Sequence, residues 1–101
     1  MEIAVIYLRQ KENESVENFL ISSDKFILSL KKKYIVITII ADYYNENGQL
    51  YNFINSTKKN LDVLILDHLL NDEFDIRLIK EVARMENFRV DFIKRNTDNT
   101  I

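Results

Sequence analysis

The chain has 101 residues with 14 basic and 16 acidic side chains, so its net charge is −2 and it has no strong positive field to attract nucleic acid. It contains no cysteine, which excludes disulfides, thiolate metal sites and cysteine nucleophiles. Proline is absent and Gly48 is the single glycine, which excludes the glycine-rich loops that cradle phosphates in P-loop and dinucleotide-binding proteins.

In chain order, the first half predicts two strands and one helix. Residues 3–8 (IAVIYL) form a short, continuously apolar run, which is typical of a central strand of a parallel sheet. Residues 14–33 carry apolar side chains at helical spacing and end in three lysines, which predicts a helix with Asn13 or Ser15 as its N-cap. Residues 34–41 (YIVITIIA) are rich in β-branched side chains and predict the second strand.

The second half continues the alternation. Residues 42–48 (DYYNENG) are polar and predict an exposed loop. A short helix follows from Leu50 and ends at residues 58–60. Residues 62–66 (DVLIL) predict a third strand, residues 76–85 a third helix after a loop at 67–72, and residues 89–93 (RVDFI) a fourth strand. Residues 94–101 are expected to form a frayed polar tail.

This alternation predicts a three-layer α/β fold. Strands that are apolar on both faces and alternate with helices favour a mostly parallel four-stranded sheet with helices on both faces. We expect residues 1–93 to form one domain, which can bury about 60 to 65% of its unfolded surface. Nothing resembles a signal segment, and the apolar runs fall short of the ~20 residues of a membrane span. We therefore expect a cytoplasmic protein.

Functional groups in parallel sheets collect where the strands end. The candidates at that edge are Arg9 and Lys11 after the first strand, Asp42 after the second, and Asp67 with His68 after the third. The two cations could hold a phosphate or carboxylate. We favour the alternative that these charges pair with one another across the sheet edge, because charged residues at strand ends are common.

The remaining reactive side chains give little support for catalysis. His68 is the only histidine, and without a second ligand a transition-metal site is not expected, so we interpret His68 as exposed and unengaged. Ser15 is the only serine expected near the edge, and we interpret it as a helix cap. Tyr43 and Tyr44 lack the basic neighbours of a base-stacking platform and favour a protein contact or partial packing against the sheet edge. No cofactor or metal is predicted.

Nearly the whole chain resembles the catalytic domain of serine recombinases, the resolvase and invertase family. Tyr7-Leu8-Arg9-Gln10-Lys11 is similar to the Tyr-x-Arg-x-Ser signature of that family, and Asp42 is similar to the aspartate that ends its second strand. Residues 50–54 and 62–66 resemble its second helix and third strand. The resemblance implies a resolvase-like or flavodoxin-like fold and active-site positions at Tyr7, Arg9, Lys11, Asp42 and Asp67.

The chain departs from this pattern where the chemistry occurs. Members of the family cut DNA by attack of the signature serine on a phosphodiester, while arginines stabilise the charge on the phosphate. Lys11 stands at the serine position, and residues 67–71 (DHLLN) offer no arginine where the family has two. The resemblance therefore implies a degenerate, non-cutting member that acts as a protein-interaction or regulatory module. Its expected partner is another protein or a second copy of itself. We expect weak or no nucleic acid binding of its own and a link to DNA recombination or a mobile element.

A second resemblance leads to a different function. Residues 62–82 are similar to the middle of response-regulator receiver domains, in which an aspartate that ends the third strand accepts a phosphoryl group. Asp67 would be that acceptor. Receivers also hold Mg²⁺ with an acidic pair at the end of the first strand, and Leu8 and Arg9 stand there instead. We rank the receiver-like phosphoacceptor second.

Overall fold

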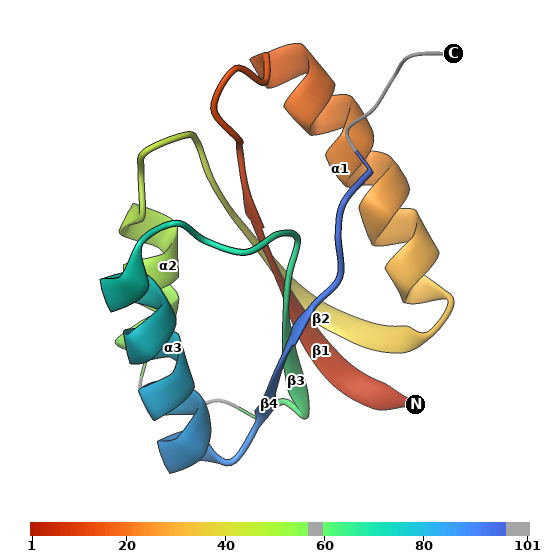
Figure 1. Cartoon of the computed structure of the whole chain (residues 1–101). Coiled ribbons are helices and arrows are strands. Elements are labelled where there is room, and N and C mark those ends of the chain that lie inside the picture. Colours follow the sequence, from red (N-terminus) through yellow and green to blue (C-terminus); the bar gives the residue numbers. More distant parts are fainter. Residues whose placement is uncertain (57–59, 97–101) are drawn as a thin grey trace.

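The computed structural model describes residues 1–56 and 60–96 and has the predicted α/β architecture (Figure 1). The elements are β1 (Glu2–Arg9), α1 (Val16–Lys31), β2 (Tyr34–Asp42), α2 (Gly48–Ile54), β3 (Val63–Leu66), α3 (Glu73–Glu86) and β4 (Arg89–Phe92). The four strands form one sheet in the order β2-β1-β3-β4, and every neighbouring pair is parallel. Because all neighbouring strands are parallel, the carboxyl ends of the four strands lie at the same edge of the sheet.

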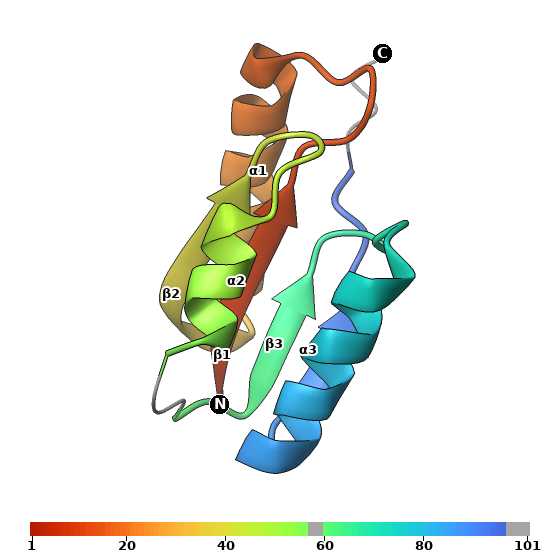
Figure 2. The ribbon, with the colours of Figure 1, turned by 90° about the vertical axis from the view of Figure 1, so that its left-hand side faces the viewer.

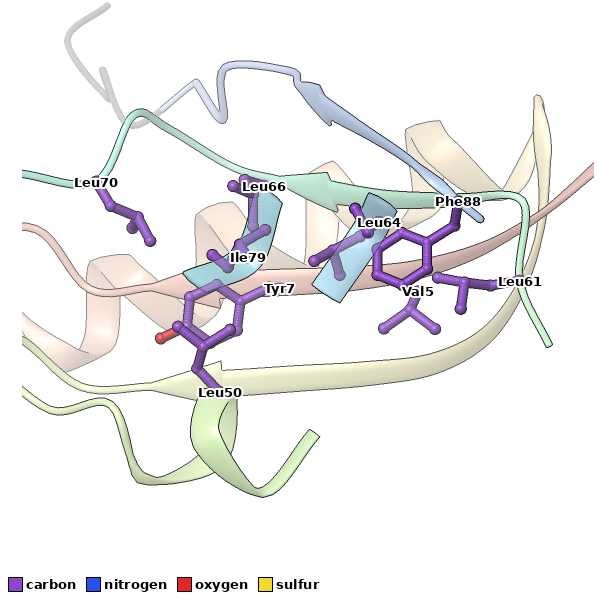
Figure 3. Packing of buried hydrophobic residues seen from close by; sticks show 10 residues of the cluster. Val5, Tyr7, Leu50, Leu61, Leu64, Leu66, Leu70, Ile79 and Phe88 are labelled. Atoms are coloured by element: carbon purple, nitrogen blue, oxygen red, sulfur yellow. The ribbon is translucent and has the colours of Figure 1, made fainter. Parts of the chain in front are cut away.

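The sheet lies between two helical layers, with α1 on one face and α2 and α3 on the other (Figures 1 and 2). Alternate residues of β1 point to opposite faces. Ala4, Ile6 and Leu8 pack in the cluster with α1, whereas Val5 and Tyr7 pack with α2 and α3 (Figure 3). Each fully buried aliphatic side chain contributes about 1.5 to 3 kcal/mol through removal of apolar surface from water, so the central strand is the main source of stability.

The strand β2 differs from the prediction that both faces of every strand are covered. It lies at the edge of the sheet, where Ile35, Ile37 and Ile39 remain 46%, 52% and 43% exposed. A register shift opposite Ala4 and Val5 makes Ile37 an extra residue in the ladder, which is the pattern of a β-bulge. The sequence of β2 is as apolar as that of a central strand, but the strand order leaves it with one neighbour.

The helix ends follow local chemistry. Ser15 Oγ accepts a hydrogen bond from the Asn18 backbone N–H at 3.0 Å, which confirms Ser15 as the N-cap of α1. Asp72 caps α3 through the Phe74 N–H, and the helix ends at Asn87 with φ 62°, a left-handed conformation that asparagine tolerates.

The second helix is displaced from its prediction. It begins at Gly48, which the sequence assigned to the loop, and ends at Ile54, before the expected end at residues 58–60. Residues 58 and 59 lie outside the described part of the chain.

The expected frayed tail is wrong at Arg95, which is fully buried. The backbone N–H of Ile93 donates to the Leu66 carbonyl at 3.0 Å, and that of Arg95 donates to the Asp67 carbonyl at 2.9 Å. The chain therefore continues alongside β3 after β4 ends, and the packed domain extends past residue 93 to Arg95. Residues 97–101 of the predicted tail lie outside the described residues.

Candidate functional site

A cleft of about 500 Å³ lies where the strands end. It is lined by residues 9–12 after β1, 44–47 after β2 and 68–72 after β3, together with Asp75 of α3. The structure therefore brings Arg9, Lys11 and His68 to one place, as the parallel sheet predicts. Asp42 and Asp67 are buried beside the cleft and do not line it.

Tyr7, Asp42 and Arg9 form a connected hydrogen-bond network. The Tyr7 hydroxyl donates to Asp42 Oδ2 at 2.7 Å, and Arg9 Nε donates to the Tyr7 oxygen at 2.8 Å. Asp42 also accepts from the backbone N–H groups of Gln49 and Leu50, at 3.0 and 3.1 Å. Burial and the bond to Asp42 raise the pKa of Tyr7 above its usual range. Asp42 therefore anchors the first turn of α2 rather than facing a ligand.

The charge of Arg9 is balanced inside the protein. Its Nη2 lies 3.2 Å from Asp75 Oδ2, and Asp75 is almost completely buried. The other oxygen of Asp75 accepts from the Tyr51 hydroxyl at 2.7 Å, and this hydrogen bond raises the pKa of Tyr51 to about 12. Arg9 thus links β1 to α2 and α3. The sequence placed Arg9 correctly, but it gave no sign that Asp75 is its partner.

A second arginine lies under the cleft. Arg95 Nε donates to Asp67 Oδ2 at 2.7 Å, and its Nη1 and Nη2 donate to Glu14 Oε2 and Oε1 at 2.6 and 3.0 Å. Its guanidinium also stacks over the Phe19 ring, 4.9 Å from the centroid. Burial opposes ionisation of Glu14, but its bonds to Arg95 outweigh this effect and lower its pKa. Sequence reasoning missed Arg95 because a polar C-terminal stretch resembles a solvated tail.

Asp67 is enclosed on every side. Besides the bond from Arg95, Oδ1 accepts from the Arg9 backbone N–H at 3.3 Å, and no part of the side chain reaches solvent. Burial raises the pKa of Asp67, and the neighbouring His68 and Arg95 side chains counteract only part of that effect. Its chemical role in this arrangement is to neutralise Arg95 and to hold the end of β1 against the end of β3.

His68 is not the unengaged side chain that the sequence analysis expected. Its Nε2 lies 2.9 Å from the Arg9 carbonyl oxygen, and its Nδ1 lies 2.9 Å from the Leu69 carbonyl oxygen. The ring is only partly exposed. His68 therefore joins the loop after β3 to the end of β1, with both nitrogens directed at backbone oxygens.

Ser22 lies near the strand ends in addition to Ser15, so the expectation that Ser15 is the only serine there is wrong. Ser22 Oγ lies 2.5 Å from Arg95 Nη1 and is buried beneath α1. It therefore contacts a guanidinium, but it is buried in the core and does not line the cleft. Lys11 lines the cleft, and its backbone N–H donates to Glu14 Oε1 at 3.0 Å.

The two tyrosines of the second loop are about half exposed. The Tyr43 ring packs edge-on against Phe19, with centroids 6.3 Å apart, so Tyr43 is partly packed against helix α1. The backbone N–H of Tyr44 donates to Gln10 Oε1 at 2.9 Å. This bond joins the loop after β2 to the loop after β1.

Residues 1–56 and 60–96 contain no group of three or more side chains placed to hold a metal ion. Within the same part of the chain, no helix has the length and apolar character that a membrane crossing requires. Searches against protein-family models, curated proteins and solved structures found no significant match for this chain.

Proposed function

We propose that this chain is a non-catalytic, resolvase-like domain that acts as a protein-interaction or regulatory module in the cytoplasm, linked to DNA recombination or a mobile element. The resemblance of residues 7–11 and 62–66 to the serine recombinase domain supports the link. The strand order β2-β1-β3-β4 is compatible with it. Lys11 at the position of the nucleophile supports the absence of cutting, because an ammonium group cannot form a phosphoserine bridge.

One observation carries this proposal: both guanidinium groups at the strand ends are held by buried carboxylates. Arg9 is paired with Asp75, and Arg95 is paired with Asp67 and Glu14. Phosphoryl transfer needs cations directed at the phosphate oxygens together with a nucleophile in reach. Here the cations serve the fold, since removing either one would leave a buried carboxylate without its partner.

Covalent trapping on DNA tests the absence of cutting. The purified chain is incubated with supercoiled plasmids, including plasmids carrying recombination sites, and protein-linked DNA ends are sought after denaturation. We expect none, while an active serine recombinase with its own site gives linked ends as the positive control. Linked ends that disappear in Lys11→Ala, Ser15→Ala or Ser22→Ala would overturn the proposal.

The proposal also requires that the chain associates with itself or with another protein. Light scattering and pull-down with the folded chain measure this directly. Because the net charge is −2, we expect weak or no DNA binding in a mobility-shift titration, and any residual binding should vanish as salt is added. Tight binding that resists salt would contradict this part of the proposal.

The receiver-like alternative is weaker because of Asp67. Its position after β3 is the one that a phosphoacceptor would occupy, but both carboxylate oxygens are occupied and the side chain is buried. Incubation with acetyl phosphate and Mg²⁺ tests it by mass spectrometry. We expect no added phosphoryl mass, and a mass gain that is lost in Asp67→Asn would favour the alternative.

A further inference from the structure

The two edges of the sheet are built differently. The edge strand β4 has four residues, and two of them, Arg89 and Asp91, carry charges that pair with each other and with Glu2. Charges on a short strand are a common way to prevent further strand pairing. The other edge strand, β2, has nine residues and no charge from Tyr34 to Ala41. The β4 edge is therefore protected by charges. The β2 edge carries one protective feature, the bulge at Ile37, and its stretch from Thr38 to Ala41 is uncharged and in regular register.

The exposed isoleucines of β2 lie on both faces of the sheet. Ile35 is paired with Ile3, which packs toward α2 and α3, whereas Ile39 is paired with Ile6, which packs toward α1. The bulge residue Ile37 lines a groove with Val5 and Phe53, on the α2 side. A ligand or helix docked on one face would leave the other face in water. A strand that continues the sheet covers both.

Helix α1 adds apolar surface on the same side. Ser22 lies on the flank of α1 that contacts Arg95, the residue that follows β4 in the chain. Helical geometry places Val16 and Leu20 on the opposite flank, toward β2. Both are about half exposed. The surface formed by β2 and this flank of α1, called the β2 surface below, therefore combines the apolar sheet edge with the exposed apolar side chains of Val16 and Leu20.

We propose that the β2 surface binds a second copy of this chain, with the two β2 strands antiparallel about a twofold axis. The charges at the ends of β2 support this occupant. Residues 31–33 are three exposed lysines before the strand, and Glu46 is exposed in the loop after it. Antiparallel pairing with the axis at Ile39 places the start of one strand beside the end of the other, so the lysines before one strand lie near the loop of the second copy that carries Glu46.

This arrangement also limits the assembly to two copies. The partner strand must be apolar on both faces and must carry acidic and basic groups at opposite ends, and β2 has all of these properties. An isologous pair uses each β2 edge once, and the charged β4 edges disfavour further growth. The result is a dimer with one continuous eight-stranded sheet. The inference rests on the proposed function, since it identifies the partner of the interaction module as the chain itself.

Cysteine crosslinking tests the geometry, because the chain has no cysteine of its own. Directly opposed residues of antiparallel strands have Cα atoms about 4.5 to 5.5 Å apart, within the range that a disulfide spans. Ile39→Cys should therefore form a disulfide-linked dimer readily under mild oxidation. Met85→Cys is the matched control, because Met85 is 67% exposed on α3 and lies far from β2.

Charge reversal tests the antiparallel orientation in solution. Sedimentation equilibrium should show a dimer for the unmodified chain, and Lys32→Glu or Glu46→Lys should each raise its dissociation constant by about tenfold, since each brings like charges together at two symmetric places. The double variant should restore the dimer. Ile39→Lys should give a folded monomer, and Met85→Lys should not change the association.

The proposal is overturned if the unmodified chain sediments as a monomer, or if Ile39→Cys crosslinks no faster than Met85→Cys. A dimer that is insensitive to both charge reversals also overturns it, because that dimer uses another surface. These outcomes are distinct from failure of the proposed function. A monomer that leaves no DNA-linked ends refutes the dimer alone, and a dimer that cuts DNA refutes the non-catalytic proposal alone.

Discussion

Replacing Arg95 with methionine should destabilise the protein more than any surface change. Methionine keeps much of the hydrocarbon volume, so the loss is mainly electrostatic. The substitution removes five hydrogen bonds to side chains or to the Arg9 carbonyl. It leaves buried Asp67 with the Arg9 backbone N–H as its hydrogen-bond donor and with His68 Nε2 3.6 Å from Oδ1. Removing one partner of a buried ion pair costs about 3 to 5 kcal/mol, a large share of the roughly 5 to 15 kcal/mol that holds a small domain folded.

The pH dependence distinguishes this mechanism from simple loss of packing. Burial raises the pKa of Asp67, and loss of Arg95 should raise it further. A group whose pKa is higher in the folded state destabilises the fold as pH rises above its unfolded value. The deficit of Arg95→Met should therefore be largest near pH 7 and should shrink as pH falls and Asp67 takes up a proton.

Urea denaturation followed by circular dichroism measures both effects, at about pH 7 and about pH 5. Arg84→Met is the matched control, because Arg84 forms an ion pair with Glu81 on the surface and its loss should leave the unfolding free energy nearly unchanged. Adding Asp67→Asn to Arg95→Met should recover part of the lost stability. A deficit as small as that of the control, or one that is the same at both pH values, would refute the reasoning.

Other predictions concern single groups around the same strand ends. Glu14→Gln should flatten the loss of stability in acid, because the lowered pKa of Glu14 stabilises the fold above its unfolded pKa and is lost as pH falls below it; chemical denaturation across acid pH checks this. Tyr7→Phe should cost about 1 to 3 kcal/mol, since it removes the hydroxyl that donates to buried Asp42 and accepts from Arg9 Nε, and urea unfolding should show it. Ultraviolet titration should show that Tyr7, with its raised pKa, does not ionise before alkaline unfolding. Ser23→Ala should stabilise the protein by about 1 kcal/mol, because the Ser23 hydroxyl is buried without a hydrogen-bond partner among the described residues; an unchanged or lower thermal midpoint would contradict this.

The sequence predicted the elements well where local pattern decides them. The apolar run of β1, the β-branched run of β2 and the cap at Ser15 all depend on neighbours in sequence. The exposure of β2 was not predictable in this way, because a strand that is apolar on both faces is buried or open according to the strand order. The order β2-β1-β3-β4 places it at the edge.

The candidate site was predicted in position but not in connectivity. Arg9, Lys11 and His68 reach the cleft because parallel strands end together. Their partners could not be read from the sequence, since Asp75 lies 66 residues from Arg9 and Arg95 lies 28 residues from Asp67. An arginine next to a polar C-terminal segment is typical of a solvated surface. Its burial becomes apparent only when Asp67 and Glu14 converge on it in space.

The position of Arg95 also constrains how the protein is made. Glu14 precedes it by 81 residues, so a nascent chain emerging from the ribosome exposes both acidic partners long before their counterion is synthesised. Until then the carboxylates of Glu14 and Asp67 repel each other and favour hydration of the strand ends, even after the apolar strands have collapsed. Docking of Arg95 between these carboxylates neutralises them, and the rate of this folding step should respond to ionic strength.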